Sequence, residues 1–212
     1  MFLGQLGAVA AGFTIDPDEL RASQQRFGGS WDTSWIDRLA TAQYRVVFNT
    51  SEVAEGNVLS YVSSFLDDFH EVHGTTDQQA RAVIVFRRMG TPMALNDSLW
   101  QRYAIGEDQK ITDPETKAPA TRNLFWRPRA GATGWEAQYA LEPLKARGLI
   151  SLVCNVALSN MAARMARKQQ RDPEVVKGEW RENLVPGAIL VPSGIYALIR
   201  AQNAGCAFMP GT

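Results

Sequence analysis

Cys154 is the residue of this sequence best placed for nucleophilic chemistry. It follows the apolar run LISLV at 149–153, which predicts a buried strand, and a segment with helical spacing begins directly after it. A thiol at a helix N-terminus faces unpaired backbone N–H groups and the positive end of the helix dipole, which favour the thiolate. A thiolate attacks electrophiles and can carry a persulfide. The alternative interpretation is a small apolar side chain packed at a strand end.

Histidine is not expected to assist this cysteine. The two histidines of the sequence, His70 and His73, close a predicted helix that begins near residue 58. In a parallel α/β arrangement, that end of a helix lies opposite the carboxyl ends of the strands. Activation of Cys154 would then come from the helix N-terminus and from nearby arginines. The spacing of the histidines permits a metal site, but no third ligand is evident, so no metal is expected.

Two arginines, Arg87 and Arg88, follow the predicted strand at 82–86. One of them is expected to face solvent or to pair with an acid such as Asp97. The other could present its guanidinium to an anionic ligand. The same two interpretations apply to Ser193 before Gly194: a routine helix N-cap, or a hydroxyl offered to an anion beside the helix end.

The elements that must position these residues are strands that alternate with helices. Strands are predicted at 44–49, 82–86, 149–154 and 188–191, with a short last strand at 206–209. This alternation predicts a parallel sheet with helices on both faces, and right-handed crossovers bring all carboxyl ends to one edge. Open α/β sheets bind ligands there. Besides Cys154, the candidate ligand-binding residues at this edge are Asn49, Arg87, Arg88, Asn155, Ser193 and Gly194.

The predicted domain covers residues 44–212, with a long insertion at about 90–142. Within it, the segment 106–134 is rich in Pro, Thr, Asp and Gly and lacks regular periodicity, which is typical of a lid, an interface arm or a mobile loop. A helix is predicted over 135–147. Residues 1–43 are interpreted as an apolar N-terminal segment followed by a linker and a polar helix.

The run FLGQLGAVAAGF at 2–13 has the length and texture of the apolar core of an export signal, without the positive residues that should precede it. It is similar to a truncated twin-arginine signal, and a periplasmic location would follow. The alternative is an ordinary apolar helix packed on the domain or on a partner subunit, which would fit a cytoplasmic protein. The run is too short to span a bilayer, so no transmembrane span is expected.

The overall charge argues against a general nucleic-acid binder, because 22 basic residues balance 22 acidic ones and no basic face is evident. The basic stretch of Arg164, Arg167, Lys168 and Arg171 is interpreted as the wet face of a helix. Two cysteines give neither a disulfide framework nor a zinc pattern. Cys206, which follows Gly205 near the C-terminus, is interpreted as structural, packing in an edge strand. No G-x-S-x-G, P-loop or G-x-G-x-x-G is present, so hydrolase, nucleotidase and Rossmann functions lose their usual support, and no cofactor is expected.

Two segments carry a family resemblance. RGLISLVCNVALSNMAARM and the later LVPGAILVPSGIYALIRAQNAGCAFM resemble the C-terminal half of DsrE/DsrF-like proteins over residues 147–209. VVFNT and VIVFRRMG fit the family more loosely. The resemblance implies a flavodoxin-like three-layer sandwich, with a mainly parallel sheet of about five strands, that assembles into trimers or hexamers.

The resemblance also implies a function. Some members of that family carry sulfur on a cysteine within a relay of persulfide transfers, and the matching position is Cys154. A sulfur-transfer partner protein would then be needed. The long insertion and the export-like run depart from the small cytoplasmic carriers. Two other functions stay open: non-catalytic binding of a small anionic or aromatic ligand at the same edge under the 106–134 lid, and an oligomeric assembly protein. Whether the protein is an enzyme is left open.

Overall fold

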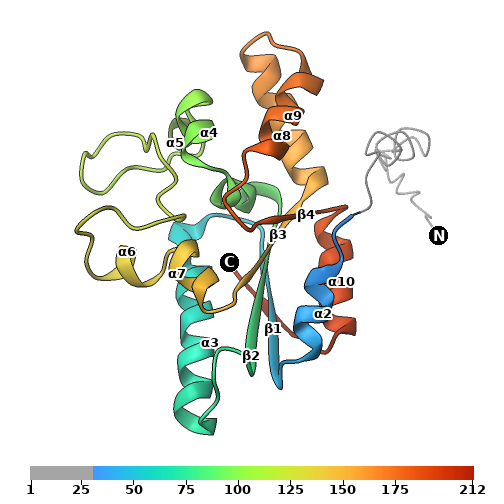
Figure 1. The fold of residues 1–212 in the computed structure, drawn as a ribbon. Helices are drawn as coiled ribbons and strands as arrows, with labels where there is room; N and C mark the ends of the chain where they lie inside the picture. The colour runs from blue at the N-terminus through green and yellow to red at the C-terminus, as the bar shows by residue number, and fades with distance from the viewer. Residues whose placement is uncertain (1–30) are drawn as a thin grey trace, which may run out of the picture. The chain divides into compact units, whose positions relative to one another are not determined.

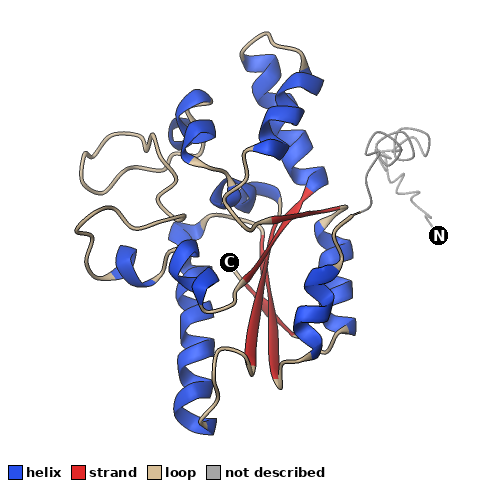
Figure 2. Ribbon diagram, in the orientation of Figure 1, coloured by secondary structure: helices blue, strands red, loops and turns tan. Residues whose placement is uncertain are grey.

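Short runs rich in valine, isoleucine and phenylalanine form the sheet, as the sequence predicts. In the computed structural model, which describes residues 31–212, the strands are β1 (Tyr44–Thr50), β2 (Ala80–Phe86), β3 (Ile150–Cys154), β4 (Ile189–Val191) and β5 (Ala207–Pro210). They form a five-stranded sheet in the order β4-β3-β2-β1-β5, and each neighbouring pair is parallel. The predicted α/β class is confirmed, with helices on both sides of the strands, as in a flavodoxin-like three-layer sandwich (Figure 2).

The central strands are buried on both faces. All five residues of β3 are buried, and only one of the seven in β2 is partly exposed. Such continuous burial is what parallel strands covered by helices on both sides require. Alternate residues enter two separate cores: Phe48 and Ile84 belong to the larger core, whereas Val47 and Val85 belong to the smaller one.

The helices divide between these two cores (Figure 1). The smaller core contains α2 (Ser34–Ala40) and α10 (Gly194–Asn203). Seven other helices of the described chain contribute residues to the larger core: α3 (Asn57–His73), η2 (Arg88–Ala94), α4 (Asp97–Arg102), α5 (Ile105–Asp108), α7 (Leu141–Ala146), α8 (Asn155–Lys168) and α9 (Pro173–Glu182). The short helices η1 (Ala54–Gly56) and α6 (Trp135–Gln138) contribute to neither core of the described residues. None of the helices within residues 31–212 has both the length and the apolar character needed to cross a bilayer.

Helix α2 is part of the α/β domain. Trp35 and Leu39, one helical turn apart, are fully buried in the smaller core with Val47. The compact unit therefore starts at Trp31, upstream of the boundary at residue 44 that the sequence suggests. The sequence does not reveal this, because the two anchors stand in a helix of only seven residues that also contains Ser34, Asp37 and Arg38. The export-like run at 2–13 lies outside the described residues.

The insertion departs from the prediction at 135–147, where two short helices replace one. The backbone N–H groups of Leu141 and Glu142 donate to the carbonyls of Phe125 and Trp126, at 2.9 and 2.8 Å. These groups are therefore not available to continue α6. Pro143 then lies in the first turn of α7, where its missing N–H is tolerated. Long-range backbone pairing has overridden the local pattern.

The basic residues of α8 do more than form a solvent-exposed helix face. Arg164 donates to both carboxylate oxygens of Asp108, at 2.8 and 2.7 Å, and Lys168 pairs with the same carboxylate. Burial acts to raise the pKa of Asp108, but hydrogen bonds from Arg164, Lys168 and Gln109 outweigh it and lower the pKa to about 2. These ion pairs tie the α8–α9 hairpin to α5.

A close approach at Gly90 fixes the end of β1 against η2. The Gly90 N–H donates to the Ser51 carbonyl at 3.1 Å, and a Cβ at Gly90 would lie 2.5 Å from the Thr50 carbonyl oxygen. We expect Gly90→Ala to lower the free energy of unfolding by about 1–3 kcal/mol, because backbone would have to move. Urea unfolding followed by circular dichroism measures the change.

The matched control is Gly178→Ala in α9, where a Cβ meets nothing within 4 Å. Alanine favours a helix interior over glycine, so this variant should gain about 0.5–1 kcal/mol. Equal stability of the two variants would contradict the close contact at Gly90.

Candidate functional site

The candidate site lies where the chain reverses its path across the sheet. After β3 the chain enters α8 on the side of the larger core, whereas after β4 it enters α10 on the side of the smaller core. The connections therefore diverge between two neighbouring strands, and this topological switch point is where open α/β sheets hold ligands. The N-termini of α8 and α10 both begin at this point.

Cys154 ends β3 and caps α8, as the sequence predicts. Its Sγ accepts a hydrogen bond from the backbone N–H of Ala157 at 3.4 Å. Cys154 pairs with Val191 across to β4, and only 6% of its surface is exposed. The alternation along β3 puts Leu152 in the smaller core and Val153 in the larger one, so Cys154 lies on the α10 side. The sulfur is thus held against a helix N-terminus.

Arg87 comes directly after the neighbouring strand, β2. Phe86, the last residue of β2, pairs with Val153 of β3, and neighbouring strands lie about 4.8 Å apart, so the backbone of Arg87 passes close to that of Cys154. The arginine stem packs on α10: a Cβ added to Gly194 would lie 3.1 Å from Arg87 Cδ. Glycine at the first position of α10 therefore leaves room for the arginine.

The guanidinium of Arg87 has no ion pair or hydrogen bond within residues 31–212, although the residue is half-buried. The other half-buried arginines of the same range have partners. These are Arg45, Arg81, Arg122, Arg129, Arg147, Arg164, Arg171 and Arg181. An unpaired and partly desolvated guanidinium is available to an anion.

Ser193 caps α10, which is the routine role that serine has at this position. Its Oγ accepts a hydrogen bond from the Tyr196 N–H at 3.1 Å. The hydroxyl proton remains free to donate, so the cap and an anion contact are compatible. Cys154, Arg87, Ser193 and Gly194 together line one side of the switch point.

The other predicted residues are not part of this group. Asn155 accepts a hydrogen bond from Arg181 Nε at 3.2 Å, so its carboxamide oxygen is engaged within the α8–α9 hairpin. Arg88 is exposed with a positive φ and starts η2. Asn49 is the second-last residue of β1, which lies one strand beyond β2. The acid suggested as an arginine partner, Asp97, instead pairs with Arg127 at 3.0 Å.

Arg181 is the residue that sequence reasoning missed. It donates to Asn155 and, through Nη2, to Ser159 at 3.2 Å. Burial lowers its pKa from the usual value. In the sequence, Arg181 is one of several polar residues of α9, and no motif predicts its contacts with α8.

Cys206 differs from Cys154 in its surroundings. It lies just before β5 in the smaller core and is buried, and burial raises the pKa of its thiol to about 11. At neutral pH it is therefore protonated and unreactive. This fits the structural role expected from the sequence.

The histidines lie away from the candidate site. His73 stacks on Tyr44 with ring centroids 5.1 Å apart, and His70 lies 3.2 Å from Asp77. Both are at the C-terminal end of α3. Within residues 31–212, no group of three or more His, Cys, Asp or Glu side chains could hold a metal ion.

Comparisons with known proteins add little to this geometry. No protein-family model matches the sequence, and no curated protein matches it. One similar solved structure is that of a protein of unknown function, MTH1491, from Methanobacterium thermoautotrophicum. It has 18% sequence identity and a TM-score of 0.42, and the match covers 79% of this chain and 98% of that one.

Proposed function

We propose that this protein handles sulfur, carrying a persulfide on Cys154. The observation that carries the proposal is the thiol held by the Ala157 N–H at 3.4 Å at the end of β3, with Arg87, whose guanidinium has no partner within residues 31–212, directly after the paired strand β2. A persulfide is more acidic than a thiol and is anionic at neutral pH, so it needs donors and a positive charge nearby. The resemblance to DsrE/DsrF-like proteins at 147–209 supports the same function.

The transfer step is an exchange between two sulfur carriers. The Cys154 thiolate attacks the outer sulfur of a donor persulfide, R–S–SH, and forms a new S–S bond. The S–S bond of the donor breaks, and the donor leaves as the thiolate R–S⁻. Atoms and electrons balance without an added oxidant, and the product is Cys154–S–SH. The donor belongs to a partner protein or a small persulfide.

Burial of Cys154 sets the conditions for access. Because only 6% of the residue is exposed, a donor must approach from the edge of the sheet where α8 and α10 begin. Val156, in the first turn of α8, is 51% exposed and offers an apolar contact near Cys154. A bulky donor is therefore expected to need docking contacts on the surrounding surface.

We expect protein incubated with a persulfide donor to gain 32 Da, the mass of one sulfur atom, on Cys154. Peptide mapping by mass spectrometry under non-reducing conditions measures it. Cys154→Ser should lose the addition completely, whereas Cys206→Ser should keep it, because burial leaves Cys206 protonated. Sulfur uptake that persists in Cys154→Ser would remove the proposal.

The neighbouring residues Arg87 and Arg88 allow the rates of sulfur uptake by two matched variants to be compared. Arg87→Met keeps an apolar stem over Gly194 but removes the charge, and should slow uptake about tenfold, equivalent to about 1.4 kcal/mol. Arg88→Met is the matched control, since Arg88 is exposed and should leave the rate unchanged. Equal rates for both variants would exclude Arg87 from the step.

A second candidate function uses the same residues without chemistry. The Arg87 guanidinium, the Ser193 hydroxyl and the N-terminus of α10 form a set of donors that suits a small anion. Native mass spectrometry of freshly isolated protein distinguishes the two functions. A retained anion that survives Cys154→Ser favours binding, whereas a persulfide that this variant loses favours sulfur transfer.

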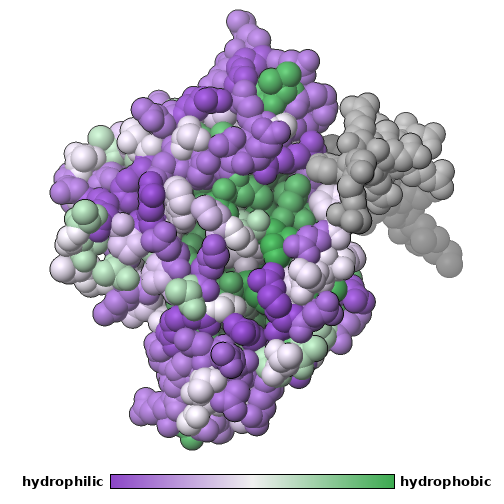
Figure 3. Space-filling model, viewed as in Figure 1, coloured by the Kyte–Doolittle hydropathy of each residue, from purple (hydrophilic) through white to green (hydrophobic). Residues whose placement is uncertain are grey.

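A homo-oligomer is the assembly we propose, through the surface of α10 beside the edge strand β4. Ile195 and Ile199 lie one turn apart on α10 and are 61% and 52% exposed. Figure 3 shows apolar side chains gathered around β3 and β4 on the face that it draws. Apolar area of this kind is buried by association.

We expect the double variant Ile195→Glu, Ile199→Glu to be monomeric, because two charges would be desolvated at the contact. Light scattering on the parent and variant proteins measures the masses. Val72→Glu is the control: Val72 is 73% exposed on α3, and its variant should keep the oligomeric mass. A monomeric parent protein would remove this assembly.

A further inference from the structure

A cavity lies away from Cys154, where the insertion meets the start of α3. Its volume is about 600 Å³, within the range of small-molecule sites. Its walls come from the loop after β1, the segment after α5 and the segment that leads into α6. None of the residues at the switch point lines it.

The cavity offers aromatic and aliphatic surface. Trp135 is 40% exposed, and Phe125, Leu124 and Ile111 form much of the remaining apolar wall. The rings of Phe125 and Trp135 lie so close to Gly56 that an added Cβ would be 2.7 Å from each. The indole is therefore seated on the start of α3 and keeps an open face, which suits stacking against a planar ring.

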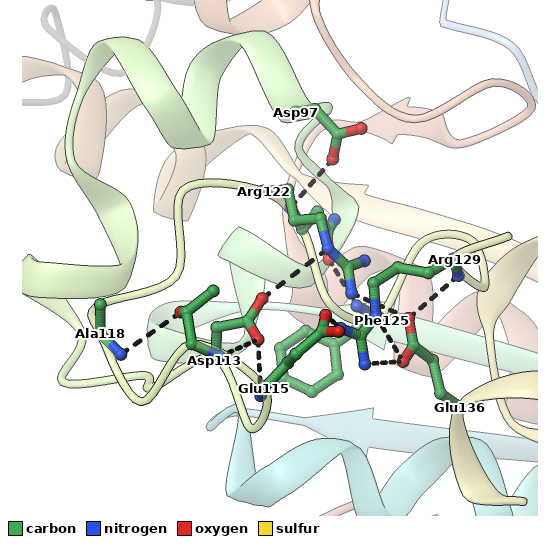
Figure 4. A network of polar contacts seen from close by, with 10 residues as sticks. Asp97, Asp113, Glu115, Ala118, Arg122, Phe125, Arg129 and Glu136 are labelled. Carbon is green, nitrogen blue, oxygen red and sulfur yellow. Dashed lines mark hydrogen bonds and ion pairs between the residues drawn. The ribbon is translucent and has the colours of Figure 1, made fainter. Parts of the chain in front are cut away.

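A polar network fixes the outer wall of the cavity (Figure 4). Glu136, which lines the cavity, accepts from Arg129 at 2.9 Å and from Arg122 at 2.8 Å. Asp113 accepts from the backbone N–H of Glu115 at 2.9 Å and holds the adjacent loop. Burial acts to raise the pKa of Glu136, but these arginine hydrogen bonds outweigh it and lower the pKa. The Glu136 carboxylate is thus already paired with arginines of the cavity wall.

Two other charged side chains that line the cavity have no partner within residues 31–212. Glu55 and Lys110 line it and are exposed, and neither side chain has an ion pair or hydrogen bond within residues 31–212. Both also have positive φ, as does their neighbour in the wall, Ala54. Non-glycine residues in this region of backbone space are strained, and such strain concentrates at ligand sites.

We propose that this cavity binds a small aromatic zwitterion of the aromatic amino-acid class. The ring stacks on Trp135 within the apolar wall. The ammonium pairs with Glu55, and the carboxylate pairs with Lys110. One free anion and one free cation beside an aromatic surface match this class better than a purely anionic or purely cationic aromatic. The site is independent of sulfur transfer at Cys154.

The test compares three probes that share the indole ring. Isothermal calorimetry with tryptophan, tryptamine and indole-3-acetate should rank tryptophan first, about threefold or more tighter than the other two. Trp135→Ala should weaken all three about tenfold. Glu55→Gln should remove the advantage over indole-3-acetate, and Lys110→Gln should remove the advantage over tryptamine. Thermal unfolding of each variant checks that it is folded.

Controls separate this site from the others. Tyr61→Ala alters a different groove, between α3 and β5, and should leave tryptophan binding unchanged. Cys154→Ser should also leave it unchanged, so failure here and failure of sulfur transfer are distinguishable. Equal affinity for the three probes, absence of binding, or binding unaffected by Trp135→Ala would overturn the proposal.

Discussion

The reversal of the chain after β4 is the constraint on which the candidate site depends. The first four strands progress across the sheet in one direction, and β5 must then pair with β1 at the opposite edge. Helix α10 makes this return over the face that the other crossovers leave free. The connections after β3 and β4 therefore diverge, and two helix N-termini come to one place. Gly194 is part of the same constraint, because the return helix passes over the Arg87 stem.

Much of this arrangement was predictable from the sequence, because it follows from local pattern plus topology rules. Short β-rich runs gave the strands to within about two residues, since buried parallel strands are continuous apolar segments. The position of Cys154 between strand and helix, and the cap at Ser193, follow from residue type and spacing alone. Gathering them at one edge needs only the right-handed crossover rule.

The predictions that were wrong concern features that depend on contacts between distant segments of the chain. The split between α6 and α7 comes from backbone hydrogen bonds to 125–126, which no periodicity encodes. Asp97 has Arg127 as its partner, although Arg87 and Arg88 are nearer in the sequence. The engagement of Asn155 by Arg181 likewise needs the α8–α9 hairpin to be folded. Whether an arginine is paired is a property of the tertiary structure, and that property is what distinguishes Arg87.

The two proposed sites differ in what stabilises them. The position of Cys154 at the switch point follows from the strand order itself, so it persists as long as the sheet does. The cavity at Trp135 depends on ion pairs in the insertion. Because the folded-state pKa of Glu136 is lowered, its contribution to stability is present above its usual pKa near 4.5 and is lost as the pH falls through the folded value. Acid should therefore loosen the cavity wall through Glu136, whereas nothing in the sheet order depends on that carboxylate. Ligand binding at Trp135 should consequently be lost in acid before the parallel sheet unfolds, and comparing tryptophan affinity with far-ultraviolet circular dichroism between pH 7 and pH 3 separates the two events.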